Sequence, residues 1–186
     1  MKIAITGGIG SGKSYVCRLL EARGIRIYDC DSAAKHLMRT SPQIRQQLTA
    51  LIGPDAYLAD GQLNKACVAQ FLMASESNKQ AINAIVHPAV AEDFTQSGLQ
   101  WMECAILYES GFDHLVDSVI AVTAPLPVRL ERIMQRDHIS RQSALAWIHK
   151  QWPQHELQQR AQFEIVNDGR PLEPQIEHII NNIIKE

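Results

Sequence analysis

The hydrophobic positions at the start of the chain form one short run that stops at glycines. Residues 2–6 read KIAIT, and four of the next six residues are glycine. A short apolar run of this kind predicts a buried strand. After the glycines, Val16, Leu19 and Leu20 recur at helical spacing. The pattern therefore predicts a strand, a glycine-rich loop and a helix that ends near Gly24.

Four later stretches also predict short strands. They are apolar or rich in β-branched residues and are bounded by turn or polar residues. They comprise residues 25–28, 104–108, 118–124 and 163–167. Between most of them the hydrophobic period changes to three or four residues, which predicts helices. Short buried strands that alternate with helices are typical of a parallel α/β sheet.

The segment from residue 32 to residue 100 contains no strong strand signal. Its hydrophobic residues recur every three or four positions, so we expect a mostly helical insertion between strands of the sheet. Proline suits the first turn of a helix, and glycine marks turns between helices. On these signals, helices are predicted after Ser41-Pro42, after the turn at Asp60-Gly61, from a capping Ser77 and from His87-Pro88.

The carboxyl-terminal part of the chain predicts three more helices. One begins within APLPVRLERIMQRD at residues 124–137, and the next is capped by Ser140 and ends before Pro153. The tail is strongly amphipathic, because its isoleucines fall on one helical stripe. They are Ile176, Ile179, Ile180, Ile183 and Ile184.

Composition places the chain among ordinary globular proteins. It has 186 residues, of which 46% are hydrophobic and 20% charged, and its net charge is −2. No polybasic surface is expected, and no apolar run approaches the roughly 20 residues of a membrane span. The amino terminus lacks the pattern of a signal peptide. We therefore expect a cytoplasmic monomer or weak homo-oligomer that binds neither nucleic acid nor membrane.

The glycine-rich loop carries a specific motif. Residues 7–14 read GGIGSGKS and fit G-x-x-x-x-G-K-[ST] without a mismatch, between a predicted strand and a predicted helix. Backbone N–H groups of such a loop face phosphate oxygens, and the helix terminus adds partial positive charge. Lys13 would reach the β- and γ-phosphates, and Ser14 would bind Mg²⁺ through its hydroxyl. The predicted nucleotide site comprises Gly8, Ile9, Gly10, Ser11, Gly12, Lys13, Ser14 and Tyr15.

The remaining motifs favour a small-molecule kinase over other nucleotide-binding classes. No guanine-reading N-K-x-D string is present, and the strand predicted at 104–108 is followed by a single acid, Glu109. A kinase needs a carboxylate near the acceptor, an insertion that holds the acceptor, and arginines that neutralise the transferred phosphoryl group. Asp31 follows the second predicted strand, where ligands of open α/β sheets bind. Arg129, Arg132 and Arg136 share one helix face.

Together these motifs resemble the dephospho-coenzyme A kinase family along almost the whole chain. The similarity rests on TGGIGSGKS at the amino terminus, on an Asp-x-Asp motif at 29–31, and on His87-Pro88. It continues through Leu107-Tyr108-Glu109 and Arg136-Asp137. It also includes Asp60-Gly61 with Leu63, and Arg132, Gln151, Ala161 and Asn167. The phosphate loop is shared by many families, whereas its combination with Asp-x-Asp and His-Pro is much more specific.

The resemblance implies a fold and a division of the chain. The fold is of the P-loop NTPase type, a three-layer α/β/α arrangement with a five-stranded parallel sheet, as in nucleoside monophosphate kinases. Residues 1–186 would form one kinase domain. Its nucleotide-binding core would comprise residues 1–31, 87–126 and 160–186, its helical coenzyme A-binding insertion residues 32–86, and its helical lid residues 127–159.

The resemblance also implies an activity, which is phosphoryl transfer from ATP, with Mg²⁺, to the ribose 3′-hydroxyl of dephospho-CoA. The products would be CoA and ADP, in the last step of coenzyme A synthesis. Asp31, Lys13 and Arg136 would be catalytic, and Asn167 would lie near the adenine. Two alternatives are a kinase for another nucleoside or sugar acceptor and a nucleotide-dependent binding protein with little turnover.

Three neighbouring residues have different expected uses. Asp31 would orient the acceptor hydroxyl, or it would cap a helix that starts at Ser32. Asp29 would reach the metal through water or hydrogen-bond the phosphate loop. Cys30 would face the opposite way, into packing.

Four other residues carry open questions at this stage. His87 would contact the acceptor, or it would simply begin a helix. Glu109 would contact the acceptor or the metal, or it would be a structural acid at a strand end. Arg129 would serve the phosphate site or face solvent. Tyr15 replaces the family's usual Thr, whose hydroxyl can lie near the α-phosphate. The phenol of Tyr15 cannot copy that contact, but the backbone N–H of Tyr15 can still donate a hydrogen bond.

Overall fold

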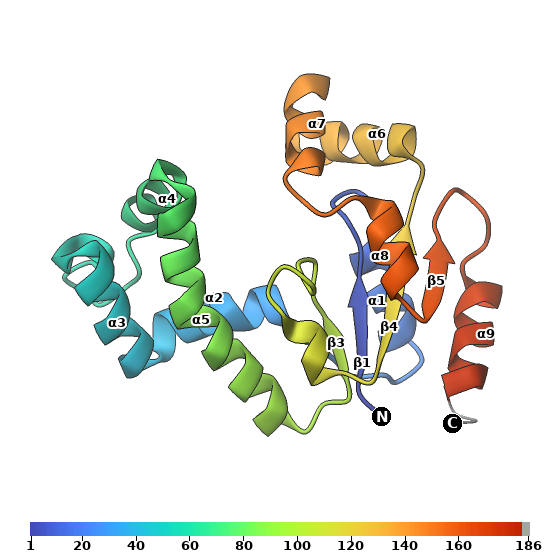
Figure 1. The fold of residues 1–186 in the computed structure, drawn as a ribbon, viewed down its shortest axis with the longest axis horizontal. Coiled ribbons are helices and arrows are strands. Elements are labelled where there is room, and N and C mark those ends of the chain that lie inside the picture. Colours follow the sequence, from blue (N-terminus) through green and yellow to red (C-terminus); the bar gives the residue numbers. More distant parts are fainter. Residues whose placement is uncertain (184–186) are drawn as a thin grey trace. The chain divides into compact units, whose positions relative to one another are not determined.

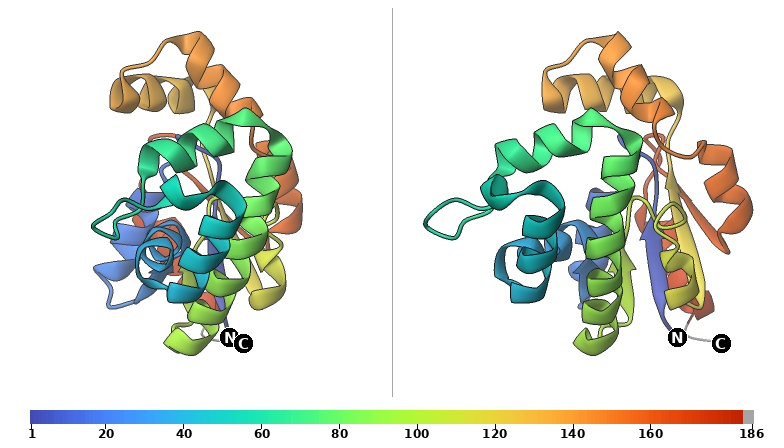
Figure 2. Two further views of the ribbon diagram at one scale, coloured as in Figure 1. Left: turned by 90° about the vertical axis from the view of Figure 1, so that its left-hand side faces the viewer. Right: turned by 60° about the vertical axis from the view of Figure 1, so that its left-hand side comes forward.

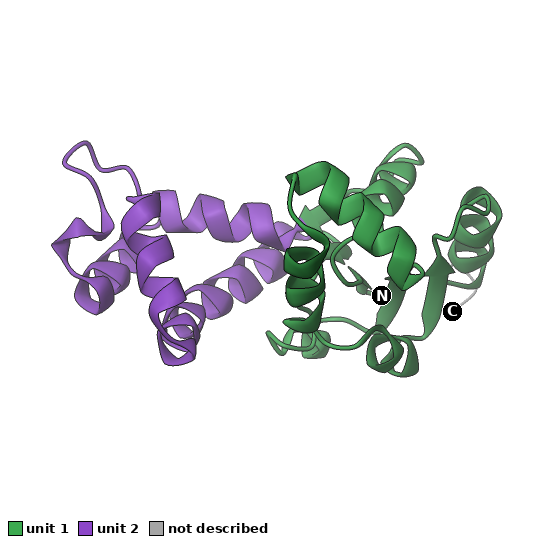
Figure 3. Ribbon diagram, turned by 90° about the horizontal axis from the view of Figure 1, so that it is seen from above, with its two compact units in different colours: residues 1–28, 99–186 green, residues 29–98 purple. Residues whose placement is uncertain are grey.

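The computed structural model describes residues 1–183. The chain divides into two compact units (Figure 3). The first unit comprises residues 1–28 and 99–186, and the second comprises residues 29–98. Ile184, the last residue of the predicted isoleucine stripe, lies outside the described residues.

A five-stranded sheet forms the centre of the first unit, with strand order β2-β3-β1-β4-β5 (Figure 1). Strand β1 pairs in parallel with β3 and with β4, and β4 pairs in parallel with β5. In parallel pairs the carboxyl ends of the strands meet at one edge, where loops can build a binding site. The strands are β1 (Ile3–Thr6), β2 (Ile27–Asp29), β3 (Trp101–Glu103), β4 (Ser118–Thr123) and β5 (Phe163–Val166).

Helices α1 (Lys13–Glu21) and α9 (Glu173–Ile183) pack on the sheet through their apolar stripes. Leu20 of α1 and Ile176 of α9 are each 1% exposed and belong to one cluster with residues of β1, β4 and β5. The strands contribute almost fully buried side chains to that cluster, as their continuous apolar runs predict. The amphipathic tail therefore forms a helix that closes the core.

Three more helices follow β4 in the first unit. They are α6 (Leu126–Asp137), α7 (Arg141–His149) and α8 (Gln154–Arg160). Helices α6 and α7 lie beyond the carboxyl ends of β1 and β4 (Figures 1 and 2). Leu130, Ile133 and Ala144 form a small apolar cluster between α6 and α7. Ser140 caps α7 as predicted, whereas α8 was not predicted.

The second unit is helical, as expected. It contains α2 (Cys30–Thr40), α3 (Pro42–Ile52), a short 3₁₀ helix (Pro54–Ala56), α4 (Lys65–Ala74) and α5 (Glu76–Ser97). Helix α5 contacts each of the other three α-helices. Ser41 and Asn64 cap α3 and α4 through their side-chain oxygens.

The predicted helix start at His87-Pro88 is wrong, because α5 runs through Pro88 without a break. Its cap is Ser75 rather than Ser77. An interior proline costs about 3 kcal/mol. Four residues spaced four apart, Ile82, Val86, Val90 and Phe94, are 0–5% exposed on this helix. Burying each contributes about 1.5–3 kcal/mol, so the continuous stripe outweighs the proline.

The strand predicted at residues 104–108 is also wrong. The strand is Trp101–Glu103, and residues 105–110 form turns. Leu107 is 0% exposed and Cys104 4% exposed, so this run is apolar because its turns pack against the core. An apolar run of this length does not by itself distinguish a strand from another buried segment. The displacement matters, because it changes which acid ends the strand.

No helix among the described residues has the length and apolar content that a membrane span requires.

Candidate functional site

The glycine-rich loop joins β1 to α1 at the carboxyl edge of the sheet. Gly10 and Gly12 have φ angles of +80° and +91°, in the left-handed region that favours glycine. Within residues 1–183, the backbone N–H groups of Gly10, Gly12, Lys13 and Ser14 have no hydrogen-bond partner. Together with the positive end of α1, these donors form a site that can bind phosphate oxygens.

The carbonyl groups of the same loop are held by side chains from α6 and from the segment after β5. Arg129 Nε donates to Ile9 O at 2.9 Å, and Arg132 Nη1 donates to Gly10 O and Ser11 O at 3.3 and 3.2 Å. Asn167 Nδ2 also donates to Ser11 O, at 2.9 Å. On the predicted arginine face of α6, Arg129 and Arg132 therefore bind the loop backbone instead of pointing into solvent.

Asn167 is 8% exposed and has both ends of its side chain occupied. Its Oδ1 accepts a hydrogen bond from Arg132 Nη2 at 3.1 Å while its Nδ2 binds the loop. A Cβ on Gly12 would collide with Asn167 Nδ2, so Gly12 is required for space as well as for φ. In this structure Asn167 supports the loop, and a place for it near the adenine remains a prediction.

Glu103, the last residue of β3, lies beside the two side chains that the motif assigned to phosphate and metal. It forms an ion pair with Lys13 Nζ, and its Oε1 accepts a hydrogen bond from Ser14 Oγ at 3.2 Å. Glu103 is not among the predicted site residues, because the predicted strand began after it, at residue 104. The signal in the sequence is an acid directly after the apolar Trp101 and Met102. In the sheet, Glu103 lies opposite Ile5 of β1.

A cavity of about 460 Å³ opens in front of the loop. Lys13, Ser14 and Tyr15 line it from the start of α1, and Arg18 follows one turn later. Tyr15 is 46% exposed, and the Arg18 guanidinium lies 5.6 Å from its ring centroid. The other lining residues are Gly7, Gly8, Ile9, Gly10, Gly12, Ala105, Arg132, Ile133, Arg136 and Gln151.

Arg136, which the sequence assigned to catalysis, is exposed and lines this cavity. Its guanidinium forms an ion pair with the neighbouring Asp137, with Nη2 to Oδ2 at 2.7 Å. That hydrogen bond holds the pKa of the Asp137 carboxyl below its usual value. A phosphate oxygen can replace the carboxylate oxygen on the guanidinium, because both accept the same N–H donors.

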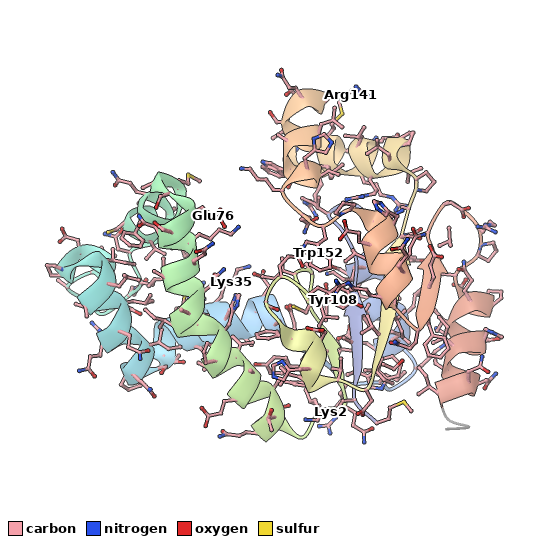
Figure 4. The ribbon with its side chains drawn as sticks, viewed as in Figure 1. Lys2, Lys35, Glu76, Tyr108, Arg141 and Trp152 are labelled. Atoms are coloured by element: carbon pink, nitrogen blue, oxygen red, sulfur yellow. The ribbon has the colours of Figure 1, made fainter. Side chains whose placement is uncertain are left out.

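Gln151 connects the segment after α7 to the phosphate loop. Its Oε1 accepts a hydrogen bond from Ile9 N at 2.7 Å. The adjacent Trp152 stacks on Tyr108, with ring centroids 5.5 Å apart, and its backbone N–H donates to Glu109 Oε1 at 3.2 Å (Figure 4). Glu109 thus holds the segment that carries Gln151. Contact of Glu109 with an acceptor remains a prediction.

The acids of the Asp-x-Asp motif belong to the second unit and have unequal roles there. Asp29 caps α2, since its Oδ1 accepts from Asp31 N and Ser32 N at 2.9 and 3.1 Å. The alternative use of Asp31 as this cap is therefore wrong. Asp31 lies in the first turn, exposed, and forms an ion pair with Lys35, the residue labelled in Figure 4. Cys30 between them is 6% exposed, as expected.

His87 lies inside α5 and is half-buried. Burial lowers the pKa of its imidazole from the usual value of 6.5. The neutral ring is therefore the favoured form at pH 7, and it can donate or accept a hydrogen bond. Its contact with an acceptor remains a prediction.

Comparison with known proteins identifies the relatives of the chain. Residues 1–173 match the family model described as dephospho-CoA kinase. A dephospho-CoA kinase of Bacteroides fragilis is 43% identical over 188 aligned residues, which cover 97% of this chain and 91% of that protein.

Two solved structures share the fold. The crystal structure of a Thermus thermophilus protein has a TM-score of 0.83 at 29% identity, covering 100% of this chain and 96% of that one. The dephospho-CoA kinase from Campylobacter jejuni has a TM-score of 0.70 at 20% identity, covering 100% of this chain and 98% of that one. The predicted P-loop α/β fold is confirmed.

Proposed function

Because the chain belongs to the dephospho-CoA kinase family, we propose that it transfers the γ-phosphoryl group of ATP to dephospho-CoA, giving CoA and ADP in the last step of coenzyme A synthesis. The observation that carries the proposal is the phosphate loop. Its N–H groups, which have no partner within residues 1–183, and Lys13 meet at a cavity that Arg136 also lines. Phosphoryl transfer depends mainly on such positioning and charge stabilisation.

We place the ribose 3′-hydroxyl of the acceptor at Asp31. This residue follows the carboxyl end of β2 by two positions, and ligands of open α/β sheets bind at that end of the strands. Asp29 caps the helix, so the Asp31 carboxylate is not used for the cap, and the acceptor hydroxyl would displace the exposed Lys35 from it. The transition state of phosphoryl transfer is loose, and the proton therefore leaves the hydroxyl late. Asp31 orients the hydroxyl and then accepts its proton.

Lys13 and Arg136 neutralise the transferred group in this proposal. In the structure each pairs with a carboxylate, Lys13 with Glu103 and Arg136 with Asp137. Bound phosphates would replace these carboxylates as partners of the two cations, since phosphate and carboxylate accept the same hydrogen bonds. His87 and Glu109 are proposed to contact the acceptor and Asn167 the adenine. Residues 32–86 are proposed to bind coenzyme A, and residues 127–159 to form the lid.

The residues beside the loop suit Mg²⁺. Ser14 offers a hydroxyl and Glu103 a carboxylate 3.2 Å away, and Mg²⁺ prefers oxygen ligands. Ser14 would bind the ion directly, and Glu103 would hold Ser14 and the ion's water ligands. When bound, the ion would supply positive charge that offsets the negative charge of the phosphates. Within residues 1–183 no cluster of three His, Cys, Asp or Glu side chains offers a protein-only metal site.

Glu103→Gln is expected to raise the Mg²⁺ concentration needed for half-maximal activity by about 10–100-fold, because residues that orient metal ligands contribute that much. Titration of activity with Mg²⁺ at fixed ATP measures the change. The exposed Glu177 of α9 also pairs with a cation, Arg23 beyond the carboxyl end of α1, so Glu177→Gln is the matched control. An unchanged Mg²⁺ dependence in the Glu103 variant would remove Glu103 from the metal site.

A coupled assay of ADP release tests the proposed reaction. ATP and Mg²⁺ are supplied with dephospho-CoA, with other nucleosides, with sugars, or with no acceptor. The proposal predicts that dephospho-CoA accelerates ADP release far above every other condition. Acceleration by a different acceptor would assign the chain another kinase activity, and no acceleration by any acceptor would favour a nucleotide-dependent binding protein.

We also propose that the enzyme is cytoplasmic, acts as a monomer or weak homo-oligomer and binds no nucleic acid.

A further inference from the structure

Arg129 is a buried cation without a carboxylate. It is 5% exposed on α6, and no Asp or Glu oxygen lies within 4.0 Å of its guanidinium among the described residues. Burial lowers the pKa of Arg129 from its usual value of 12.5, but arginine stays protonated in proteins. A buried charge needs compensation, and the group that it does contact is the phosphate loop. Its Nε donates to Ile9 O at 2.9 Å.

Gly8 shows how closely the guanidinium approaches the loop. Its φ angle lies outside the left-handed region, so its conformation does not require glycine. A Cβ on Gly8, however, would lie 2.5 Å from Arg129 Nη2. The absence of a side chain at Gly8 therefore makes room for Arg129.

The hydrogen bond to Ile9 O also determines the direction of the Gly10 N–H, which belongs to the same peptide group. In a planar trans peptide, a carbonyl and the following N–H point in opposite directions. With Ile9 O held by Arg129, the N–H of Gly10 faces away from α6. In the same way, Arg132 and Asn167 hold Ser11 O and orient the N–H of Gly12. Both N–H groups are among those without a partner in residues 1–183.

We propose that Arg129 is a positioning residue of the phosphate site, which fixes the Ile9–Gly10 peptide so that Gly10 N–H faces the nucleotide, and whose buried charge the bound phosphates compensate. The family resemblance covers Arg132 and Arg136 and assigns nothing to Arg129. Arg132 and Arg136 line the cavity, whereas Arg129 acts through the loop backbone. The inference rests on the proposed function, and it concerns the phosphate half of the site alone.

Binding of ADP and of inorganic pyrophosphate, measured by titration calorimetry without an acceptor, tests this role independently of the acceptor's identity. Arg129→Met is expected to weaken the binding of both ligands by about 10-fold or more. The variant lacks the buried positive charge, and its Gly10 N–H is no longer directed at the phosphates. In turnover the same variant raises KM for ATP, with kcat within about threefold of wild type, since the contact is equally present in ground and transition states. Arg129→Lys, which keeps the charge, recovers part of the affinity.

Two further variants separate positioning from a general loss of stability. Arg26 is an exposed cation directly before β2, at the other end of the strands from the loop, and Arg26→Met should leave binding unchanged. Gly8→Ala should displace the guanidinium and weaken ADP binding in the wild-type background, but should cost little more when combined with Arg129→Met. If Arg129→Met fails to fold, Gly8→Ala and Arg129→Lys carry the test. Unchanged ADP and pyrophosphate affinity in these variants, a fall in kcat without a change in KM, or additive effects at Gly8 and Arg129 would overturn the proposal.

Discussion

Asp31→Asn is expected to lower kcat by about 10²–10⁴-fold while the protein stays folded. The amide keeps the size of the carboxylate but cannot accept the proton of the acceptor hydroxyl. The side chain is exposed and the cap of α2 is Asp29, so the substitution removes no core contact. Steady-state turnover at saturating ATP and dephospho-CoA, with the circular dichroism spectrum as the check on folding, measures the effect.

Glu76 provides a matched control for Asp31. Both acids lie in the first turn of a helix, and each pairs with a lysine of the next turn, Glu76 with Lys79 and Asp31 with Lys35. Loss of either charge costs at most about 1 kcal/mol of helix stability. Glu76→Gln should leave kcat unchanged. Near-normal turnover in the Asp31 variant, or an equal loss in both variants, would remove Asp31 from the mechanism.

Lys13→Met is expected to lower kcat/KM by about 10²–10³-fold, the usual effect of removing one positioned donor from a developing negative charge. The side chain lies at the phosphate loop in the first turn of α1, where it also pairs with Glu103. Its loss therefore removes a phosphate contact and leaves the Glu103 carboxylate without its cation. Initial rates over a range of ATP concentrations give the change in kcat/KM.

A double variant separates these two consequences. Lys13→Met with Glu103→Gln should recover stability lost by the single Lys13 variant, because no unpaired carboxylate remains, but it should recover no activity. Arg23→Met, at an exposed pair with Glu177 beyond the carboxyl end of α1, should leave kcat/KM unchanged. Recovery of activity in the double variant would mean that Lys13 acts only by neutralising Glu103.

Both cations assigned to the transferred phosphoryl group already have carboxylate partners in this structure. Lys13 pairs with Glu103, and Arg136 pairs with Asp137. The Arg136 pair is largely exposed and contributes little to stability, so a phosphate can displace Asp137 at small cost. The Lys13 pair is more buried, with side chains 12% and 15% exposed, and Glu103 remains next to Ser14 after exchange. ATP binding would thus replace one set of ion pairs by another.

The phosphate loop could be predicted from sequence because its function resides mainly in backbone conformation. Glycines and a helix start determine that conformation, and both are visible as a local pattern. Six strands and helices could be predicted for the same reason, since each carries its own periodicity and boundary residues. They are β1, α1, β4, α6, α7 and β5.

The errors arose where tertiary packing decides the local structure. Pro88 is tolerated inside α5 because four buried residues on one stripe outweigh it. The apolar run at 104–108 packs as turns, so β3 lies earlier and ends at Glu103. A three-residue strand is too short to show a period, and only its pairing with β1 reveals that Glu103 reaches Lys13.

The uses of individual charged residues depended on burial and on competing hydrogen bonds. Spacing placed Arg129 on the same helix face as Arg132 and Arg136, but only the structure shows that Arg129 is buried against Ile9. Both Asp29 and Asp31 suit a helix cap, and the point at which α2 begins decides for Asp29.

The fate of the γ-phosphoryl group itself distinguishes transfer to dephospho-CoA from hydrolysis of ATP. The purified protein is incubated with Mg²⁺, dephospho-CoA and ATP labelled at the γ-phosphate, and the products are separated and examined by ³¹P NMR. If the proposed transfer occurs, the label appears in CoA, as a monoester on the ribose 3′-oxygen, in a one-to-one ratio with ADP. Label found only in inorganic phosphate, or on another oxygen of the acceptor, would contradict it.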